Sequence, residues 1–344
     1  MAGRVDQFPN EFQSEPDMDP VSTHVLATHK ADRPLMACRY SVDGAYVFAA
    51  SEDYKVWRFR VSDGSKVALD SDAWVRGLAF ADAGKTLITA GYDGRLIWWD
   101  ALAENPAPQR TVAGHAGWIR AVAVSPDGTL VASVGNDRMV RLWSHADGSL
   151  VREMPGHESH IYNVAFHPSG ETLLTGDLYG HLMDWEVASG KQIRVIKSES
   201  LSKYDKGFYA QIGGFRGLIF NADGTQVAAS GITNVSNAFA GVGNPSVVIF
   251  DYAKGEQVIE HLSKGPLQGV AWNVAFHPQN VIISSTGGSG GHYLFWKAGE
   301  KETFHQFKMP SDVRDFALAP DGLHLAAAQG NGQLTISLMN PKQS

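Results

Sequence analysis

The chain has 344 residues, of which 44% are hydrophobic and 10% aromatic, and a formal net charge of −7. This composition is typical of a globular protein, and the negative charge disfavours a protein that binds nucleic acid or an anionic membrane. A single cysteine, Cys38, excludes an internal disulfide and suits a reducing compartment. Cys38 lies in an apolar strand pattern, so we interpret it as a small buried hydrophobe rather than a nucleophile.

The N-terminal segment is polar and acidic and contains prolines without a period, so we expect residues 1–20 to form a disordered tail. A short linear motif between Phe8 and Phe12 is the functional alternative for this segment. The N-terminal segment lacks the apolar core of a secretory signal. No apolar run in the chain approaches the roughly 20 residues that span a bilayer. We therefore expect a cytoplasmic protein.

A repeated unit is the main folding signal, and its clearest copy runs from His115 to Trp143. It contains three short runs rich in Val, Ala, Ile and Leu, separated by turn residues: Ile119–Val124, Leu130–Val134 and Met139–Trp143. Short apolar runs at this spacing predict antiparallel strands. One unit cannot bury its own faces, so the pattern predicts an array of such units.

Seven units follow one another along the chain, and each has a turn between its first two strands. These turns lie at Gly44, Gly84, Gly128, Gly170, Gly224, Asn280 and Gly322. The period is about 40–45 residues, as in propeller blades, and it lengthens on both sides of the fifth unit. The seventh unit has no fourth strand, whereas a lone strand-like run, Ser22–Thr28, precedes the first unit.

Several short motifs accompany this period: the pairs Gly114–His115, Gly156–His157 and Trp99–Asp100, and turns such as Ser125–Gly128. With them the chain resembles the WD-repeat β-propeller family. The resemblance implies an all-β fold over residues 21–340, a single domain of seven four-stranded antiparallel blades. It also implies that the N-terminal strand completes the last blade, which removes exposed sheet edges.

In this family a His, a Ser or Thr, an Asp and a Trp form a buried hydrogen-bond chain within a blade. The third unit has the complete structural tetrad: His115, Ser133, Asp137 and Trp143. The second unit has Ser71 in place of the His, beside Thr89, Asp93 and Trp99. The fourth has Tyr179 at the Asp position, beside His157, Thr175 and Trp185. We interpret these histidines as structural, and we expect no zinc site at His157, His160 and His167, because no Cys or carboxylate stands at ligand spacing.

Aligned on their turns, the units share a position in the first strand that we call the Arg120 position. It is occupied by Met36, Arg76, Arg120, Tyr162, Arg216, Trp272 and Arg314. Two residues earlier, at the Trp118 position, stand Pro34, Trp74, Trp118, His160, Gly214, Val270 and Asp312. With a side-chain period of two, both positions fall on one side of the strand. The resemblance places them near the top face, around the mouth of the central channel, where partners of this family dock.

Arginines interleaved with Trp and Tyr suit acidic groups and aromatic stacking, and they often dominate binding energy. The alternative is that the arginines are a family feature paired with neighbours. Two insertions, Ser198–Gly214 and Gly231–Pro245, and a glycine-rich link, Gly287–Gly291, are implied to lie on the same face. Long loops on a rigid scaffold often carry binding. For the glycine-rich link we expect flexibility rather than a phosphate cradle, because no Lys follows.

These observations predict a non-enzymatic platform that binds a protein or peptide on its top face, and the arginines favour an acidic one. The predicted contact residues are Trp74, Arg76, Trp118, Arg120, His160, Tyr162, Tyr209, Arg216, Phe239, Trp272 and Arg314. We expect no metal, cofactor, nucleic acid or membrane partner, and a monomer. The alternative is an enzyme of hydrolase or redox type with a central-channel site, for which the first strands offer Asp312, Asp315 and His160. A nucleic-acid reader that uses the arginines is disfavoured by the net charge.

Overall fold

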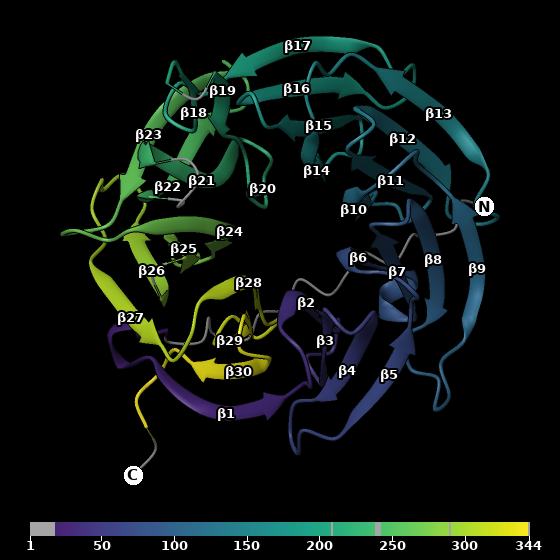
Figure 1. Cartoon of the computed structure of the whole chain (residues 1–344), viewed down its shortest axis with the longest axis horizontal. Coiled ribbons are helices and arrows are strands. Elements are labelled where there is room, and N and C mark those ends of the chain that lie inside the picture. The colour runs from purple at the N-terminus through teal and green to yellow at the C-terminus, as the bar shows by residue number, and fades with distance from the viewer. Residues whose placement is uncertain (1–17, 208, 238–241, 289, 343–344) are drawn as a thin grey trace, which may run out of the picture.

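The computed structural model describes residues 18–207, 209–237, 242–288 and 290–342. They form thirty strands and two single-turn 3-10 helices, η1 (Pro20–Ser22) and η2 (Asp82–Gly84). Seven four-stranded antiparallel sheets stand side by side in a ring, as blades of a propeller (Figure 1). Within these residues no helix has the length and apolar character needed to cross a membrane.

Blades one to four follow the chain directly, each with four consecutive strands. Blade one contains β2 (Leu35–Tyr40), β3 (Tyr46–Ser51), β4 (Lys55–Arg60) and β5 (Lys66–Asp70). Blade two contains β6 (Val75–Ala81), β7 (Thr86–Gly91), β8 (Arg95–Asp100) and β9 (Pro108–Ala113). Blade three contains β10 (Ile119–Val124), β11 (Leu130–Gly135), β12 (Met139–Ser144) and β13 (Leu150–Pro155). Blade four contains β14 (Ile161–Phe166), β15 (Thr172–Asp177), β16 (His181–Glu186) and β17 (Gln192–Lys197).

The remaining blades include the irregular part of the ring. A two-stranded hairpin, β18 (Ser202–Asp205) and β19 (Ala210–Gly213), precedes blade five. Blade five contains β20 (Gly217–Phe220), β21 (Gln226–Asn237), β22 (Val242–Asp251) and β23 (Glu256–Leu262). Blade six contains β24 (Gly269–His277), β25 (Val281–Gly288), β26 (Gly291–Lys297) and β27 (His305–Met309). Blade seven contains β28 (Val313–Leu318), β29 (His324–Gln329), β30 (Gln333–Leu338) and, from the N-terminus, β1 (His24–Lys30).

The ring closes through β1, which pairs antiparallel with β30, as the resemblance implied (Figure 1). The strand begins two residues later than expected, because Ser22 belongs to the turn η1, where Asp19 caps the backbone of Val21. Most of the expected disordered tail lies outside the described residues. Its last part is ordered, however: Met18 packs against the core between blades six and seven, and the Asp19 N–H donates to the Met339 carbonyl.

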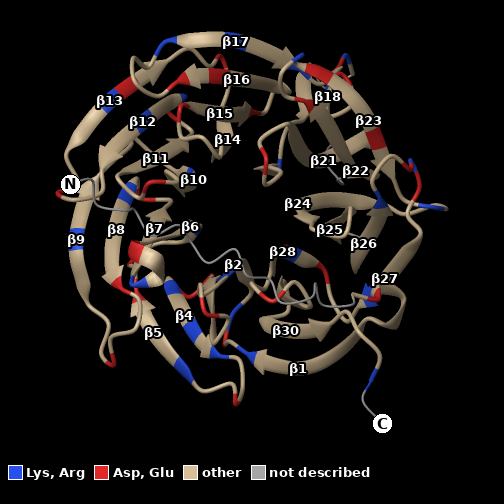
Figure 2. Cartoon of the chain, turned by 180° about the vertical axis from the view of Figure 1, so that it is seen from behind, with Lys and Arg blue, Asp and Glu red and all other residues tan. Residues whose placement is uncertain are grey.

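The core consists of apolar layers between neighbouring blades. The second and third strands of each blade are covered on both faces, so β3, β7 and β11 are almost continuously buried. The fourth strands form the outer wall and are largely exposed, as in β13 and β17. Basic and acidic residues are interspersed over this wall, as the view from behind shows (Figure 2). The packing between blades therefore holds the first strand of each blade in place around the central axis.

In blade three the tetrad forms a chain of hydrogen bonds. Trp143 Nε1 donates to Ser133 Oγ at 2.8 Å, and Ser133 Oγ lies 2.7 Å from His115 Nε2. His115 Nδ1 lies 2.8 Å from Asp137 Oδ1. Because the Asp137 carboxylate only accepts, its hydrogen bond with His115 is donated by Nδ1 of the imidazole. Each member of the tetrad therefore has a hydrogen-bond partner within it.

Blade four corrects one expectation, because Tyr179 does not take the place of the acid. Asp177, two residues earlier at the end of β15, accepts from His157 Nδ1 at 2.9 Å. Its other oxygen accepts from the N–H groups of Tyr179 and His181. The backbone of the turn thus brings a different carboxylate to the same histidine, and the blade has a complete network.

In their described parts, both insertions of blade five contain β-strands. Residues 198–214 contain the hairpin β18–β19, and residues 231–245 prolong β21 and β22 beyond the sheet. Lys203 Nζ donates to the Val235 carbonyl at 3.3 Å and so links the two hairpins. In the glycine-rich link of blade six, Gly287 and Gly288 end β25, and Gly291 begins β26. Phe208 and Phe239 lie outside the described residues.

Candidate functional site

A β-bulge occurs at the Arg120 position in six blades. The strand register shifts around Met36, Arg76, Arg120, Tyr162, Trp272 and Arg314. In blade five Arg216 stands just before β20, and its N–H donates to the Ser230 carbonyl. A bulge leaves one residue without a ladder partner and redirects its side chain. Here it turns the residue at the Arg120 position toward the axis of the ring.

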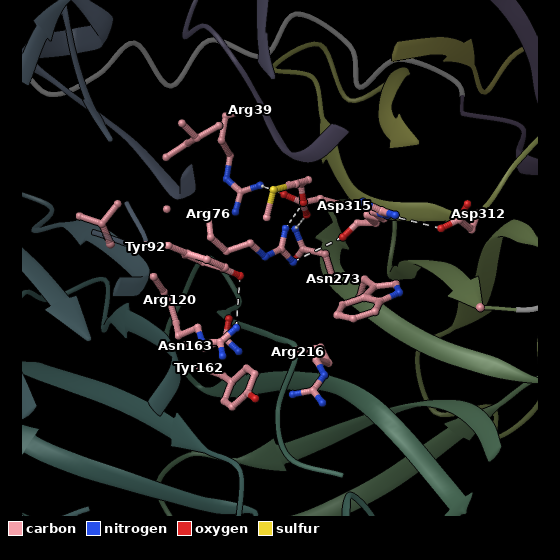
Figure 3. Close-up of a pocket in the computed structure, with 18 residues that line it drawn as sticks. Arg39, Arg76, Tyr92, Arg120, Tyr162, Asn163, Arg216, Asn273, Asp312 and Asp315 are labelled. Carbon is pink, nitrogen blue, oxygen red and sulfur yellow. Dashed lines mark hydrogen bonds and ion pairs between the residues drawn. The ribbon is translucent and has the colours of Figure 1, made fainter. Parts of the chain in front are cut away.

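All seven residues at the Arg120 position line one cavity of about 550 Å³ at the mouth of the central channel (Figure 3). We call the face on which the first strands begin the top face, and the cavity opens there. A volume of this order suits a small ligand or one or two side chains of a partner. Other side chains of the lining come from the neighbouring positions: Arg39, Tyr92, Asn163, Asn273, Asp312 and Asp315.

Two of the arginines in the cavity are paired with carboxylates. Arg314 Nη1 donates to Glu52 Oε1 at 2.6 Å, and Arg314 Nε lies 3.6 Å from Asp312 Oδ2. Arg39 Nη1 donates to Asp315 Oδ2 at 2.9 Å. Asp315 is buried, with 4% of its side chain exposed, and its other oxygen accepts from Asn273 Nδ2 at 2.7 Å. This carboxylate joins blade seven to blades one and six.

Arg76 and Arg120 are held by neutral groups. Arg76 reaches across the cavity from blade two and donates to the carbonyls of Met36 and Arg314 (Figure 3). Arg120 Nε donates to Asn136 Oδ1 at 2.9 Å, and its Nη1 donates to the Tyr92 hydroxyl at 3.2 Å. The Arg120 guanidinium also lies 4.7 Å from the ring centre of Trp118. Both side chains are therefore fixed in place by neutral acceptors rather than by carboxylates.

Arg216 differs from the others in having little hydrogen bonding. Its Nε and Nη1 atoms are buried from solvent and have no hydrogen-bond partner. The guanidinium lies 4.5 Å from the ring centre of Tyr162 and 5.7 Å from that of Trp272. Burial lowers the pKa of Arg216; Tyr162 opposes this effect, and the positive charge of Arg120 adds to it.

An arc of aromatic side chains continues from the cavity over the top face. Tyr54 lies 6.4 Å from Trp74, Trp74 lies 6.1 Å from Tyr92, and Tyr92 stacks on Trp118 at 4.3 Å between ring centres. Trp74 and Trp118 remain 38% and 42% exposed. We call Tyr54, Trp74, Tyr92 and Trp118 the aromatic arc. Exposed Trp and Tyr side chains held by stacking give contact area at a small entropic cost.

Comparison with known proteins agrees with this architecture. The family model for the WD domain, G-beta repeat, matches residues 66–100, 106–144 and 148–183. The chain is a seven-bladed β-propeller that contains WD repeats at these three places. A stretch of 126 residues of this propeller is 28% identical to Protein groucho of Drosophila melanogaster and covers 37% of the chain and 17% of that relative. A stretch of 188 residues is 25% identical to Nuclear distribution protein PAC1 of Arthroderma otae and covers 48% of the chain and 41% of the relative.

The family-model matches lie in the regular part of the propeller, from the end of blade one into blade four. The propeller matches less than half of the length of each relative. Blade five, with its two hairpins, falls outside the family-model matches. The arginines of the cavity come both from the matched repeats and from the irregular blades.

The residues at the Trp118 position do not share one side of a strand with the Arg120 position. Trp74, Trp118 and His160 precede their strands, and the bulge that follows breaks the period of two. Of this set only Asp312 lines the cavity. Trp74 and Trp118 lie in the aromatic arc instead, and His160 is exposed on the same side of blade four.

Two of the predicted contact residues lie apart from the cavity or cannot be placed. Tyr209 stands at the tip of the β18–β19 hairpin, 83% exposed, and does not line the cavity. Phe239 lies outside the described residues. The other predicted contact residues either line the cavity or stand beside it on the top face.

The alignment of the seven units did not identify Tyr92, which joins the aromatic arc to Arg120. It also missed Arg39, Asn163 and Asn273, which line the cavity from the first strands. A signal for the last three was present, because they stand one or three residues after the Arg120 position. Tyr92 comes from the turn after β7, and only the closeness of blades two and three brings it to the site.

The three histidines weighed as zinc ligands have separate partners. His157 belongs to the network of blade four, whereas His167 contacts Ser169 and the Gly224 carbonyl and stacks on Tyr252. His160 lies on the top face, where partial burial and the charges of Arg120 and Arg138 lower its pKa. Among the described residues, no group of three or more His, Cys, Asp or Glu side chains could hold a metal ion.

Proposed function

We propose that this propeller is a non-enzymatic interaction platform that binds a peptide or protein partner on its top face. The observation that carries the proposal is the aromatic arc beside a cavity lined by arginines. Trp74 and Trp118 are exposed although each is large and apolar, and Trp, Tyr and Arg are the residues that dominate binding energy at interfaces. The cavity supplies a recess for an anchoring side chain.

The basic lining favours an acidic partner. Five arginines and two aspartates line the cavity of a chain whose net charge is −7. Charge of one sign concentrated in a recess steers an oppositely charged partner toward it. We further propose that the protein is a monomer by itself and acts in the cytoplasm, consistent with its single, buried cysteine.

The alternative, an enzyme with a central-channel site, receives less support from the geometry. Asp315 is committed to Arg39, Asn273 and backbone N–H groups. Asp312 is paired with Arg314 and Ser311. A general base or nucleophile needs a free lone pair directed at the substrate. The oxygens of these two carboxylates instead accept hydrogen bonds and form ion pairs within the fold.

The test is affinity capture from native lysate with the full chain and two variants. Trp74→Ala removes an exposed member of the aromatic arc, and Ile193→Ala removes an exposed side chain of similar apolar character on the outer strand β17. We expect Trp74→Ala to lose its captured proteins, with affinity reduced about 30-fold or more, a typical hot-spot effect. The Ile193→Ala variant should retain them. Retention of every partner by a folded Trp74→Ala protein would contradict the proposal.

A further inference from the structure

The positive charges of the cavity are only partly neutralised. Arg39 and Arg314 have carboxylate partners, whereas Arg76, Arg120 and Arg216 have none among the described residues. The unpaired three come from blades two, three and five and converge on one recess (Figure 3). Three like charges that line a half-enclosed space raise one another's energy unless an anion joins them.

Arg216 gives the more specific signal. A guanidinium presents five N–H donors, and a buried donor without an acceptor is costly, so nearly all buried polar atoms in folded proteins are paired. Two donor atoms of Arg216 have no partner although they are buried. The rings of Tyr162 and Trp272 lie beside the guanidinium, and Tyr162 also hydrogen-bonds to it, but Nε and Nη1 have no acceptor.

Arg120 and Arg216 line the same recess and contact the same aromatic ring. The two guanidiniums lie 4.8 Å and 4.5 Å from the ring centre of the same tyrosine, Tyr162 (Figure 3). Arg120 is held by Asn136 and Tyr92, so its position does not depend on a ligand. Arg binds oxyanions through paired N–H groups, so arginines held in this recess without a carboxylate partner offer such donors to an anion.

We propose that the mouth of the channel contains a binding site for an oxyanion, a phosphate or carboxylate group, held by Arg216 and Arg120, with Arg76 beside them. The anion is carried by a side chain of the docked partner. This part of the inference rests on the proposed function. The rings of Tyr162 and Trp272 would contact the stem that carries the charged group. The aromatic arc then binds the flanking residues of the partner, and the anion sets which segment enters the recess.

Free inorganic phosphate tests the site without knowledge of the partner. Thermal unfolding of the full chain is followed in phosphate and in chloride at equal ionic strength. At ten times its dissociation constant, phosphate should raise the melting temperature by about 2 °C, from the binding free energy and the unfolding entropy of a chain of this size. The Arg216→Met variant should show no phosphate shift. In chloride it should melt at or above the wild-type temperature, because it no longer buries an unpaired charge.

The matched control is Arg314→Met, which removes an arginine from the same strand position in blade seven. Its charge is already paired with Glu52, so this variant should keep the phosphate shift. An equal shift in Arg216→Met and wild type would overturn the site, and so would the absence of any wild-type shift throughout a phosphate titration. If Arg314→Met also loses the phosphate shift, the shift reports the total positive charge of the cavity rather than a specific site. That result would also overturn the proposed site.

Phenyl phosphate distinguishes a carried anion from a free one. If the group arrives on a partner's side chain, phenyl phosphate should produce a larger shift than inorganic phosphate at equal concentration, because its ring can contact Tyr162 and Trp272. Equal shifts would overturn the partner as the source. Trp74→Ala separates this inference from the proposed function, since the ring contacts of Trp74 are with Tyr54 and Tyr92 rather than with the arginines of the site. If the Trp74→Ala protein keeps its captured partners and the wild type shows the phosphate shift, the proposed top-face platform is refuted. The anion site itself is then still supported.

Discussion

Replacement of Asp315 by alanine should destabilise the ring where its first and last blades meet. The carboxylate accepts from the Cys38 N–H at 3.1 Å and from Arg39 Nη1 at 2.9 Å, both in blade one. It also accepts from Asn273 Nδ2 at 2.7 Å in blade six. The variant leaves a buried N–H group and a buried amide without this acceptor, and each loss costs about 1 kcal/mol.

The ion pair adds a smaller contribution, because 40% of the Arg39 side chain is exposed and solvent screens the charge. We assign it about 1 kcal/mol, so the free energy of unfolding should fall by about 3 kcal/mol. Unfolding entropy of the order of 0.7 kcal/mol per kelvin is expected for 344 residues. The melting temperature should therefore fall by about 4 °C in differential scanning calorimetry.

The control is Asp70→Ala, which removes an exposed carboxylate that lies 3.7 Å from Lys55. Exposed pairs contribute little, so its melting temperature should stay within about 1 °C of wild type. If Asp315→Ala also melts within that range, the carboxylate does not help to close the ring, and the reasoning is refuted. Asp315→Asn should give an intermediate value, because it keeps one acceptor oxygen but loses the charge.

Two further predictions concern closure and the tetrad. Deletion of residues 1–30 removes β1 and exposes the edge of β30, so the protein should melt lower and scatter light at lower temperature than a chain that lacks only the polar segment 1–17; equal curves would show that β1 is dispensable. Burial opposes ionisation of Asp137, but hydrogen bonds from His115 and Arg141 hold the pKa of Asp137 well below its usual range. The ionised group therefore stabilises the fold above about pH 4, and this contribution is lost as the pH falls toward the folded-state pKa. By chemical denaturation, Asp137→Asn should be less stable than wild type by about 2 kcal/mol between pH 5 and 7, with a difference that shrinks below pH 4; a constant difference down to pH 2 would contradict this account.

The departures from the repeat show where reasoning from local patterns ends. Tyr179 occupies the aligned place of the tetrad acid in blade four, yet Asp177 fulfils the role because the turn brings its carboxylate to His157. Similarly, a side-chain period of two predicted that Trp118 and Arg120 share one side of a strand. Instead Trp118 precedes β10 and lies on the surface, whereas Arg120 stands at the bulge and lines the channel, with its guanidinium 4.7 Å from the Trp118 ring centre. Alignment locates a residue within a repeat, but backbone irregularity decides the direction of its side chain.

The repeat period and the apolar runs determined the number of blades, the approximate strand positions and the strand that closes the ring. These features follow from hydrogen bonding and burial within each repeat, which are written locally in the chain. Only the tertiary structure decided which arginines are neutralised. Glu52 reaches Arg314 and Asp315 reaches Arg39 because closure of the ring joins blade seven to blade one. Arg216 has no such partner in the described part of the chain. The neighbouring blades place aromatic rings beside it rather than carboxylates.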